Sequence, residues 1–195
     1  MNSTIVLYVH GFKSSSRANK SELTKQYIRD YEVDLAFDAM DLPNTVKAAF
    51  EEMSDMIEKY KNSGMKVTLI GSSMGGFLSM YLSAKYDIKA ALINPCVYPW
   101  MFFNRVMGKQ VNPYTGDEFE VTKNHVAEAR KIADSYELKM SNLALYLQRG
   151  DKVLDFSDSL ALLGRSALVH VEDGGSHTFD NYDSCLPEII RFLRS

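Results

Sequence analysis

Cysteine is scarce in this sequence, and neither sign of charge dominates it. The 195 residues include two cysteines, Cys96 and Cys185, which stand far apart and form no Cys-x-x-Cys pair. In a chain of this size, two reduced and buried thiols are expected rather than a disulfide framework. The sequence around them shows no pattern of metal ligands. We therefore expect no metal site and no other cofactor.

The sequence also lacks a basic surplus and a long apolar run. The formal net charge of −3 predicts no nucleic-acid partner, although local basic groups remain compatible with an anionic small substrate. The first apolar run, Ile5 to Val9, follows no basic segment and is too short for a signal peptide or a membrane span. We expect a cytoplasmic protein without a membrane span, and nothing in the pattern indicates its oligomeric state.

What the sequence does contain is an alternation of short apolar runs and longer amphipathic stretches. This alternation predicts a three-layer αβα sandwich, with a mostly parallel sheet between two layers of helices, in a single domain over residues 1–195. The expected strands span residues 4–9, 33–37, 67–70, 88–93, 143–147 and 167–171. The expected helices lie around residues 23–31, 43–60, 77–82, 123–135 and 187–193.

The helix over 43–60 has the clearest apolar face, because its apolar residues recur at the i, i+3, i+4 spacing. Asp41 is a candidate cap for its start, Pro43 suits its first turn, and Gly64 suits its far end.

The alternation breaks between Pro95 and Asn142, where we predict no strand. The segment opens with an aromatic run over 98–103, passes through a turn at 112–116, and contains the helix over 123–135. It is too long for a plain crossover, so we expect residues 95–142 to form a helical cap over one edge of the sheet. The aromatic run, with Met101 and Met107, either lines an apolar acyl pocket or packs the cap onto the sheet.

The strongest candidate site is Gly71-x-Ser73-x-Gly75, which falls between a predicted strand and a predicted helix. In that context the turn must be so sharp that a side chain at either flanking position would collide, which explains glycine at both. The hydroxyl of Ser73 would then stand at the N-terminus of a helix, where a developing anion is favoured. A Walker-type phosphate loop would need a Gly-Lys-Ser/Thr ending, which is absent. We predict that Ser73 is a nucleophile.

A serine nucleophile needs a base, and His177 is the best placed of four histidines. It follows the last strand in a glycine-containing loop, at the sheet end where Ser73 is expected. His10 ends the first strand and would support the adjoining loop through hydrogen bonds. His125 is expected on the surface of the cap helix, and His170 within a strand.

The acid that orients the histidine should follow the penultimate strand, giving the order Ser, Asp, His. Asp151 comes directly after that strand and a glycine, whereas Asp155 is better placed to cap the next helix. We favour Asp151 and keep Asp155 as the alternative. The oxyanion hole would use the backbone N–H groups of Phe12 and Met74.

With these motifs assembled, the whole chain resembles the YqiA/YcfP-type esterase family, a small bacterial branch of the α/β-hydrolases. The matching segments, in order, are residues 8–15, 71–77, 94–95, 112–116, 150–155 and 174–179. The segment Asn112-Pro113-Tyr114-Thr115-Gly116 is the most particular, because generic hydrolases lack it. One branch of the family lacks the elbow serine, but this chain retains Ser73.

The resemblance implies the α/β-hydrolase fold and an esterase acting on small or acyl esters, without a cofactor. A thioesterase or acyltransferase using the same residues is the first alternative, and a catalytically idle hydrolase fold used as a binding module is the second. Arg105, Lys109 and Arg149 would either meet an anionic head, such as a coenzyme A phosphate, or be plain surface charge.

Overall fold

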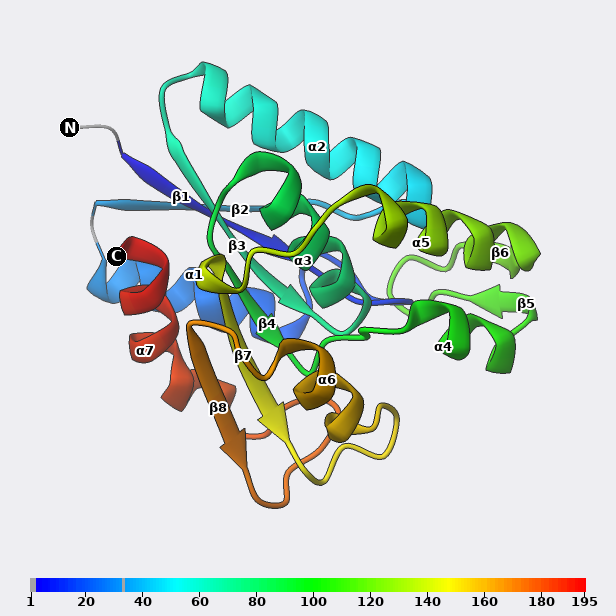
Figure 1. The fold of residues 1–195 in the computed structure, drawn as a ribbon. Coiled ribbons are helices and arrows are strands. Elements are labelled where there is room, and N and C mark those ends of the chain that lie inside the picture. Colours follow the sequence, from blue (N-terminus) through cyan, green and yellow to red (C-terminus); the bar gives the residue numbers. More distant parts are fainter. Residues whose placement is uncertain (1–2, 33) are drawn as a thin grey trace.

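One parallel sheet forms the centre of the molecule (Figure 1). The computed structural model describes residues 3–32 and 34–195; Met1, Asn2 and Val33, which was expected to begin the second strand, lie outside these ranges. Neighbouring strands follow the order β2-β1-β3-β4-β7-β8, and every pair is parallel. The strands are β1 (Thr4–Val9), β2 (Leu35–Ala39), β3 (Lys66–Ser72), β4 (Ala90–Ile93), β7 (Leu143–Gln148) and β8 (Leu168–Glu172).

Helices cover both faces of this sheet, because its central strands are apolar on both sides. In β1, Val6 and Tyr8 pack toward the core beneath α1 and α7, while Ile5, Leu7 and Val9 belong to the core beneath α2, α3 and α6. The predicted three-layer α/β fold is therefore confirmed. The covering helices are α1 (Asn19–Tyr31), α2 (Val46–Asn62), α3 (Met74–Tyr86), α6 (Phe156–Leu163) and α7 (Tyr182–Arg194).

The helix ends correct two predictions and support two others. Pro43 precedes α2 instead of lying in its first turn, because α2 begins at Val46. Thr45, not Asp41, caps α2, because its hydroxyl accepts from the N–H of Ala48 at 3.3 Å, whereas Asp41 accepts from the N–H of Ser16 at 2.6 Å. Gly64 follows the end of α2 with a φ of +83°, a conformation that favours glycine. Asp155 caps α6 by accepting from the N–H of Ser157 at 2.9 Å.

The segment between β4 and β7 contains two strands that the sequence analysis did not predict. It comprises α4 (Pro99–Arg105), β5 (Gly108–Val111), β6 (Glu118–Val121), α5 (Lys123–Ser135) and the short 3-10 helix η1 (Met140–Asn142). β5 and β6 pair antiparallel as a separate two-stranded sheet. The expectation of no strand here was wrong because these strands are short, and polar and charged residues make up half of each.

Of these elements, α4, β5, β6 and α5 gather at one end of the molecule, away from the N- and C-termini (Figure 1). We propose that residues 95–142 form a cap on a single domain, with the hairpin β5–β6 as part of it.

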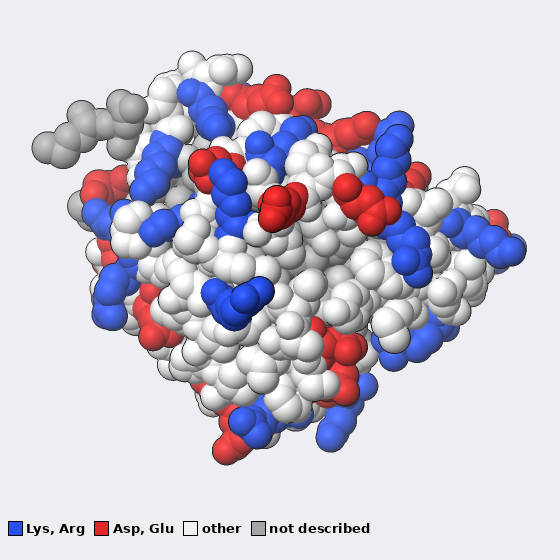
Figure 2. Space-filling view, in the orientation of Figure 1, with Lys and Arg blue, Asp and Glu red and all other residues white. Residues whose placement is uncertain are grey.

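The surface mixes charges of both signs. On the face seen in Figure 2, lysine and arginine side chains are interspersed with aspartate and glutamate. No helix in the described part of the chain has the length and apolarity needed to cross a membrane.

Candidate active site

Ser73 lies in the tight turn between β3 and α3. Its backbone has a φ of 56° and a ψ of −119°, a conformation that residues other than glycine rarely adopt. Strain of this kind persists only where the surrounding structure fixes it, and it is frequent at functional sites. The turn also sets the hydroxyl at the beginning of α3, where the first N–H groups have no partner within the helix.

The two flanking glycines are required by close approaches of the backbone. A Cβ atom on Gly75 would overlap the carbonyl oxygen of Val9, at the end of β1. A Cβ on Gly71 would overlap the carbonyl oxygen of Gly75 and the hydroxyl of Ser79. Both glycines therefore allow α3 to begin directly against the sheet, and the turn at Ser73 follows from that packing.

The structure brings Ser73, His177 and Asp151 together from three separate loops. His177 Nε2 lies 3.0 Å from Ser73 Oγ, and His177 Nδ1 lies 2.7 Å from Asp151 Oδ2. A carboxylate only accepts hydrogen bonds, so His177 Nδ1 must carry the proton that it donates to Asp151. In a neutral imidazole the lone pair is then on Nε2, which faces the hydroxyl of Ser73. The contacts fit a nucleophile, a base and an orienting acid.

Asp151 is held firmly in this position. Its side chain is almost completely buried, and its Oδ1 accepts from the N–H groups of Val153 and Leu154 at 2.8 and 2.9 Å. Burial alone would raise the pKa of Asp151, but the hydrogen bonds from His177 and from these two N–H groups outweigh burial and lower the pKa. Asp151 is therefore a carboxylate that stays charged at neutral pH, while Asp155 is occupied at the start of α6.

The loop after β1 lies directly against the serine. A Cβ on Gly11 would lie 3.1 Å from the Cβ of Ser73, so a side chain at this position would crowd the serine. Phe12 follows Gly11, and Met74 follows Ser73. Among the described residues, no hydrogen bond occupies the backbone N–H of either Phe12 or Met74. Both groups are thus available as donors, as an oxyanion hole requires.

His10 uses both of its ring nitrogens to bind the backbone. Its Nε2 accepts from the N–H of Leu42 at 2.9 Å, so the proton is on Nδ1, which donates to the carbonyl of Gly11 at 2.8 Å. Burial lowers the pKa of His10, which favours this neutral form. His10 is therefore engaged in holding the loop that carries Phe12, and neither nitrogen is free to take a proton from Ser73.

The expectation for His125 was wrong. It is buried rather than solvated, with 5% of its surface exposed, and its ring packs edge-on against Phe103 at 5.4 Å. His125 Nδ1 accepts from the N–H of Thr122 at the start of α5. The buried side chain of His125 therefore caps the N-terminus of α5. The helical pattern of the sequence does not show that this side chain is buried.

Two buried amide side chains, which sequence reasoning missed, fix the loop that carries His177. Asn94 at the end of β4 donates through Nδ2 to the carbonyls of Ser176 and His177, at 3.0 and 3.3 Å. Gln148 at the end of β7 accepts through Oε1 from the N–H groups of Ser176 and Asp180, at 3.0 and 2.8 Å.

The two residues are also joined directly, because Asn94 Oδ1 accepts from the backbone N–H of Gln148 at 3.0 Å. We call Asn94 and Gln148 the amide clamp. The available signal was a polar amide at the carboxyl end of each of two buried strands.

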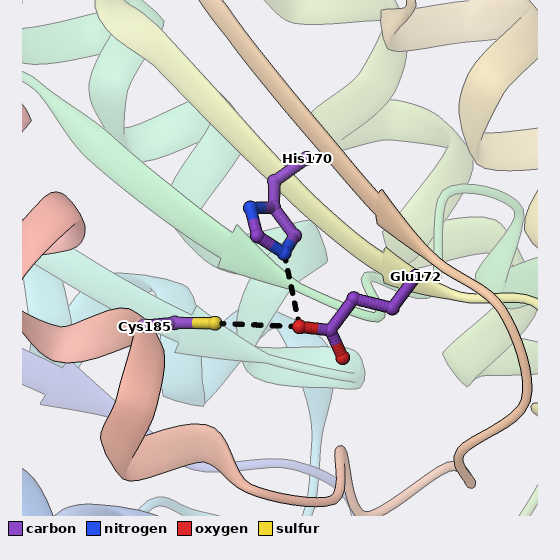
Figure 3. A group of neighbouring side chains, drawn as sticks. All are labelled: His170, Glu172 and Cys185. Atoms are coloured by element: carbon purple, nitrogen blue, oxygen red, sulfur yellow. Dashed lines mark hydrogen bonds and ion pairs between the residues drawn. The ribbon is translucent and has the colours of Figure 1, made fainter.

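Gln148 is held in turn by a cluster at the end of β8, drawn in Figure 3. Gln148 Nε2 donates to Glu172 Oε2 at 2.7 Å, and Glu172 Oε1 lies 3.0 Å from His170 Nε2 and 3.8 Å from Cys185 Sγ. His170 Nδ1 also lies 3.3 Å from Glu188. Gln148 Nε2 also donates to the carbonyl of Asp180 at 2.8 Å, so Glu172 helps to fix Oε1 as the atom that accepts from the N–H groups of the loop.

The cluster of His170, Glu172 and Cys185 is also the group in the described chain that could hold a metal ion, with donor atoms within 4.8 Å of one another. The sequence around Cys185 did not indicate these partners, because β8 and α7 bring them together. Burial raises the pKa of the Cys185 thiol, whereas a metal ligand is a thiolate. In this protonation state the cluster serves as a hydrogen-bond network.

The segment Asn112 to Gly116 forms the turn of the hairpin β5–β6 and reaches back to the loop after β1. Asn112 is buried; its Oδ1 accepts from the N–H of Tyr114 at 2.9 Å and its Nδ2 donates to the carbonyl of Ser14 at 3.0 Å. Gly116 closes the turn with a φ of +78°. These residues therefore attach the hairpin to the loop that carries Phe12.

Known proteins resemble this chain over its full length. The family described as "Uncharacterised protein family (UPF0227)" matches residues 5–194. A UPF0227 protein from Pectobacterium carotovorum is 23% identical over 190 residues, which are 96% of this chain and 98% of that relative.

Two solved structures show the fold. Est1E from Butyrivibrio proteoclasticus, determined with ferulic acid bound, has a TM-score of 0.76 at 14% identity and covers 99% of this chain and 89% of its own. The mouse alpha/beta hydrolase domain-containing protein 10 has a TM-score of 0.70 at 15% identity, covering 100% of this chain and 91% of its own. The fold is therefore the α/β-hydrolase fold, as the motifs predicted.

The amide clamp generates a prediction about stability and about the imidazole. Replacing Gln148 by Leu leaves the partly buried N–H groups of Ser176 and Asp180 without an acceptor, which should lower the free energy of unfolding by about 1–3 kcal/mol in total. Urea denaturation measures this loss. The downfield proton resonance of His177 Nδ1–H should weaken at the same time, because the loop no longer holds the ring against Asp151. Gln26→Leu, on the exposed side of α1, is the control; equal stability in the two variants would contradict the clamp.

Proposed function

The chain belongs to the UPF0227 family, whose YqiA/YcfP-type motifs it carries, and we propose that it is a serine esterase that hydrolyses small or acyl carboxylic esters. The observation that carries this proposal is the pair of hydrogen bonds from Asp151 to His177 and from His177 to Ser73, at 2.7 and 3.0 Å. The α/β-hydrolase fold places this arrangement at the carboxyl end of a parallel sheet, where the fold supports catalysis.

In the first half of the reaction, Ser73 Oγ attacks the ester carbonyl carbon while His177 Nε2 takes the hydroxyl proton. The negative charge that develops on the carbonyl oxygen is stabilised by the N–H groups of Phe12 and Met74. The tetrahedral intermediate then collapses. The carbon–oxygen bond to the alcohol breaks, His177 returns the proton to the departing oxygen, and an acyl group remains on Ser73.

In the second half, a water molecule replaces the alcohol. His177 Nε2 takes a proton from the water as the water attacks the acyl carbon, and the same N–H groups stabilise the oxyanion. Collapse breaks the bond to Ser73 Oγ, which recovers its proton from His177, and the carboxylic acid leaves. Asp151 remains charged throughout and stabilises the imidazolium form of His177.

An apolar cavity next to the turn is the proposed acyl pocket. Its volume is about 480 Å³, within the usual range for small-molecule sites. Its wall is mostly apolar and includes Tyr98 and Met101, with Arg105, Asp155 and Asp158 as its charged residues. It adjoins the site on two sides, because Cys96 in its wall donates its N–H to the carbonyl of Ser73 at 2.9 Å and Leu154 donates to Asp151.

The aromatic run divides between the two roles that the sequence left open. Tyr98 and Met101 line the cavity, whereas Phe102 and Phe103 pack against Phe12 with ring centroids 5.3 and 6.0 Å apart. Met107 is exposed and lines none of this cavity.

The basic residues that the sequence suggested for an anionic head are not gathered at Ser73. Arg149 pairs with Asp173 at 3.3 Å, Lys109 is exposed on β5, and Arg105 lies at the apolar cavity. The same three catalytic groups would also cleave a thioester, and rates on matched oxygen and thiol esters of one acyl group would separate an esterase from a thioesterase.

Covalent labelling tests the proposed nucleophile. We expect a fluorophosphonate probe to add to Ser73 in the parent protein, with the adduct located by mass spectrometry, and to give no adduct in the Ser73→Ala variant. Turnover of 4-nitrophenyl butanoate should fall by about 10⁶-fold in the same variant. Labelling that persists in Ser73→Ala would reject this serine, and a parent that never reacts would favour the binding-module alternative.

Paired substitutions test the acid. Asp151→Asn should reduce kcat by about a thousandfold or more, because the amide no longer selects the tautomer with the lone pair on Nε2. Asp155→Asn keeps a side chain that can cap α6, so kcat should change less than about twofold. Both variants are compared on 4-nitrophenyl butanoate at the same pH. The reverse ranking would move the role to Asp155.

A further inference from the structure

A second, smaller cavity opens directly beside Ser73. Its volume is about 220 Å³, and Ser73, His177 and Phe12 line it together with Lys13 and Lys20. Among the described residues, its remaining wall contains no aspartate and no glutamate. Within that part of the chain, the space in which a substrate would meet the nucleophile is bordered by two cations and by no acidic side chain, although the net charge of the protein is −3.

Lys20 approaches this cavity from the first turn of α1. Its Nζ donates to the carbonyl of Thr178 at 2.7 Å, next to His177. Within the described ranges it forms no ion pair with a carboxylate. Burial lowers the pKa of Lys20 to about 8, because its ammonium group loses water without gaining a charged partner.

Lys13 approaches from the loop after β1. Its φ of 55° is in the left-handed region, which is uncommon for a residue other than glycine. The Nζ donates to Gln110 Oε1 at 3.3 Å, and in the described chain it too has no carboxylate partner. The loop is fixed by the hydrogen bond from Asn112 to Ser14, so the strained conformation of Lys13 is maintained.

Lysines that bind neutral oxygens also occur elsewhere, since Lys61 donates to the carbonyl of Tyr86 and Lys89 to the carbonyl of Phe192. Lys13 and Lys20 differ from these in their position, because both line the cavity that contains Ser73. Among the described residues, each Nζ of this pair is bound by a neutral oxygen. A charged acceptor makes a stronger hydrogen bond with an ammonium group than a neutral one does, so an entering oxyanion would gain more than the carbonyl and amide provide.

We infer that Lys13 and Lys20 bind an anionic group of the substrate, a carboxylate or a phosphate, while Ser73 attacks the ester carbonyl of the same molecule. Esters that bear a negative charge near the scissile bond are then the preferred substrate class. The inference rests on the proposed esterase function. It adds a charge preference that neither the triad nor the apolar cavity supplies, since both would accept a neutral ester.

The test compares esters that differ only in charge. On the acyl side, 4-nitrophenyl hydrogen adipate is compared with 4-nitrophenyl methyl adipate; on the alcohol side, 4-carboxyphenyl butanoate is compared with 4-carboxamidophenyl butanoate. We expect the parent to show a higher kcat/KM for the anionic member of at least one pair. The pair that responds identifies whether the charge lies on the acid or on the alcohol part of the substrate.

The lysines are then replaced singly. In Lys20→Met and in Lys13→Met, the ratio of kcat/KM for the anionic ester to that for its neutral partner should fall by about tenfold or more. Lys20→Arg should retain much of the ratio, because it keeps the charge. Lys25→Met, an exposed position on the same helix, removes the same charge and should leave both rates unchanged.

The outcomes separate the inference from the proposed function. If Lys20 only holds the carbonyl of Thr178, Lys20→Met will slow both esters equally, and the constant ratio will overturn the inference. A parent that hydrolyses neutral esters and labels at Ser73 but shows no charge preference overturns it as well, while the esterase proposal stands. A parent that neither labels nor hydrolyses any of the four esters contradicts the proposed function itself.

A binding measurement gives a readout that does not require turnover. In Ser73→Ala protein, calorimetric titration with 4-carboxyphenyl butanoate, and separately with inorganic phosphate, should show affinity for at least one of these anions. Adding Lys20→Met should weaken that affinity by about tenfold, whereas adding Lys25→Met should not. Equal affinities in all three proteins would overturn the inference.

Discussion

The close approach of Gly75 to the carbonyl oxygen of Val9 is the constraint on which the arrangement around Ser73 depends. Because position 75 has no side chain, the first turn of α3 lies directly against the end of β1. The backbone must then turn sharply, which places Ser73 in its strained conformation and sets Gly11 against it. The proposed nucleophile and both proposed oxyanion donors thus share one packing contact between a helix and a strand.

The position of His177 depends on hydrogen bonds from side chains rather than on a packing contact. The loop carrying His177 has no regular structure to hold it, and the amide clamp of Asn94 and Gln148 supplies the missing hydrogen bonds from two neighbouring strand ends. Since amides at the ends of buried strands cannot reach water, their groups bind the loop instead. The cluster around Glu172 then fixes the orientation of the Gln148 amide, so the support extends to α7.

The parts that the sequence predicted are those that depend on local patterns. The strands of the parallel sheet are apolar runs, the turn at Ser73 needs glycines two residues to either side, and residues 123–135 have the pattern of a helix. The features that the sequence did not predict depend on contacts between residues that lie far apart in the chain. Neither the burial of His125 nor the partners of Cys185 has a local signature, and the lysines at the small cavity are indistinguishable in sequence from surface lysines until the fold brings them beside Ser73.

The attachment of the hairpin β5–β6 to the loop after β1 bears on how this protein can change through evolution. Asn112 binds the carbonyl of Ser14 and Gln110 binds Lys13, so a displacement of the hairpin would also displace the loop. An insertion in the hairpin, although remote from Ser73 in sequence, would displace a proposed oxyanion donor. Surface loops usually tolerate changes of length, but this one should be under the same selection as the proposed catalytic residues. Diversification of substrate range is then expected to proceed through the lining of the apolar cavity, where side chains can vary without moving the backbone.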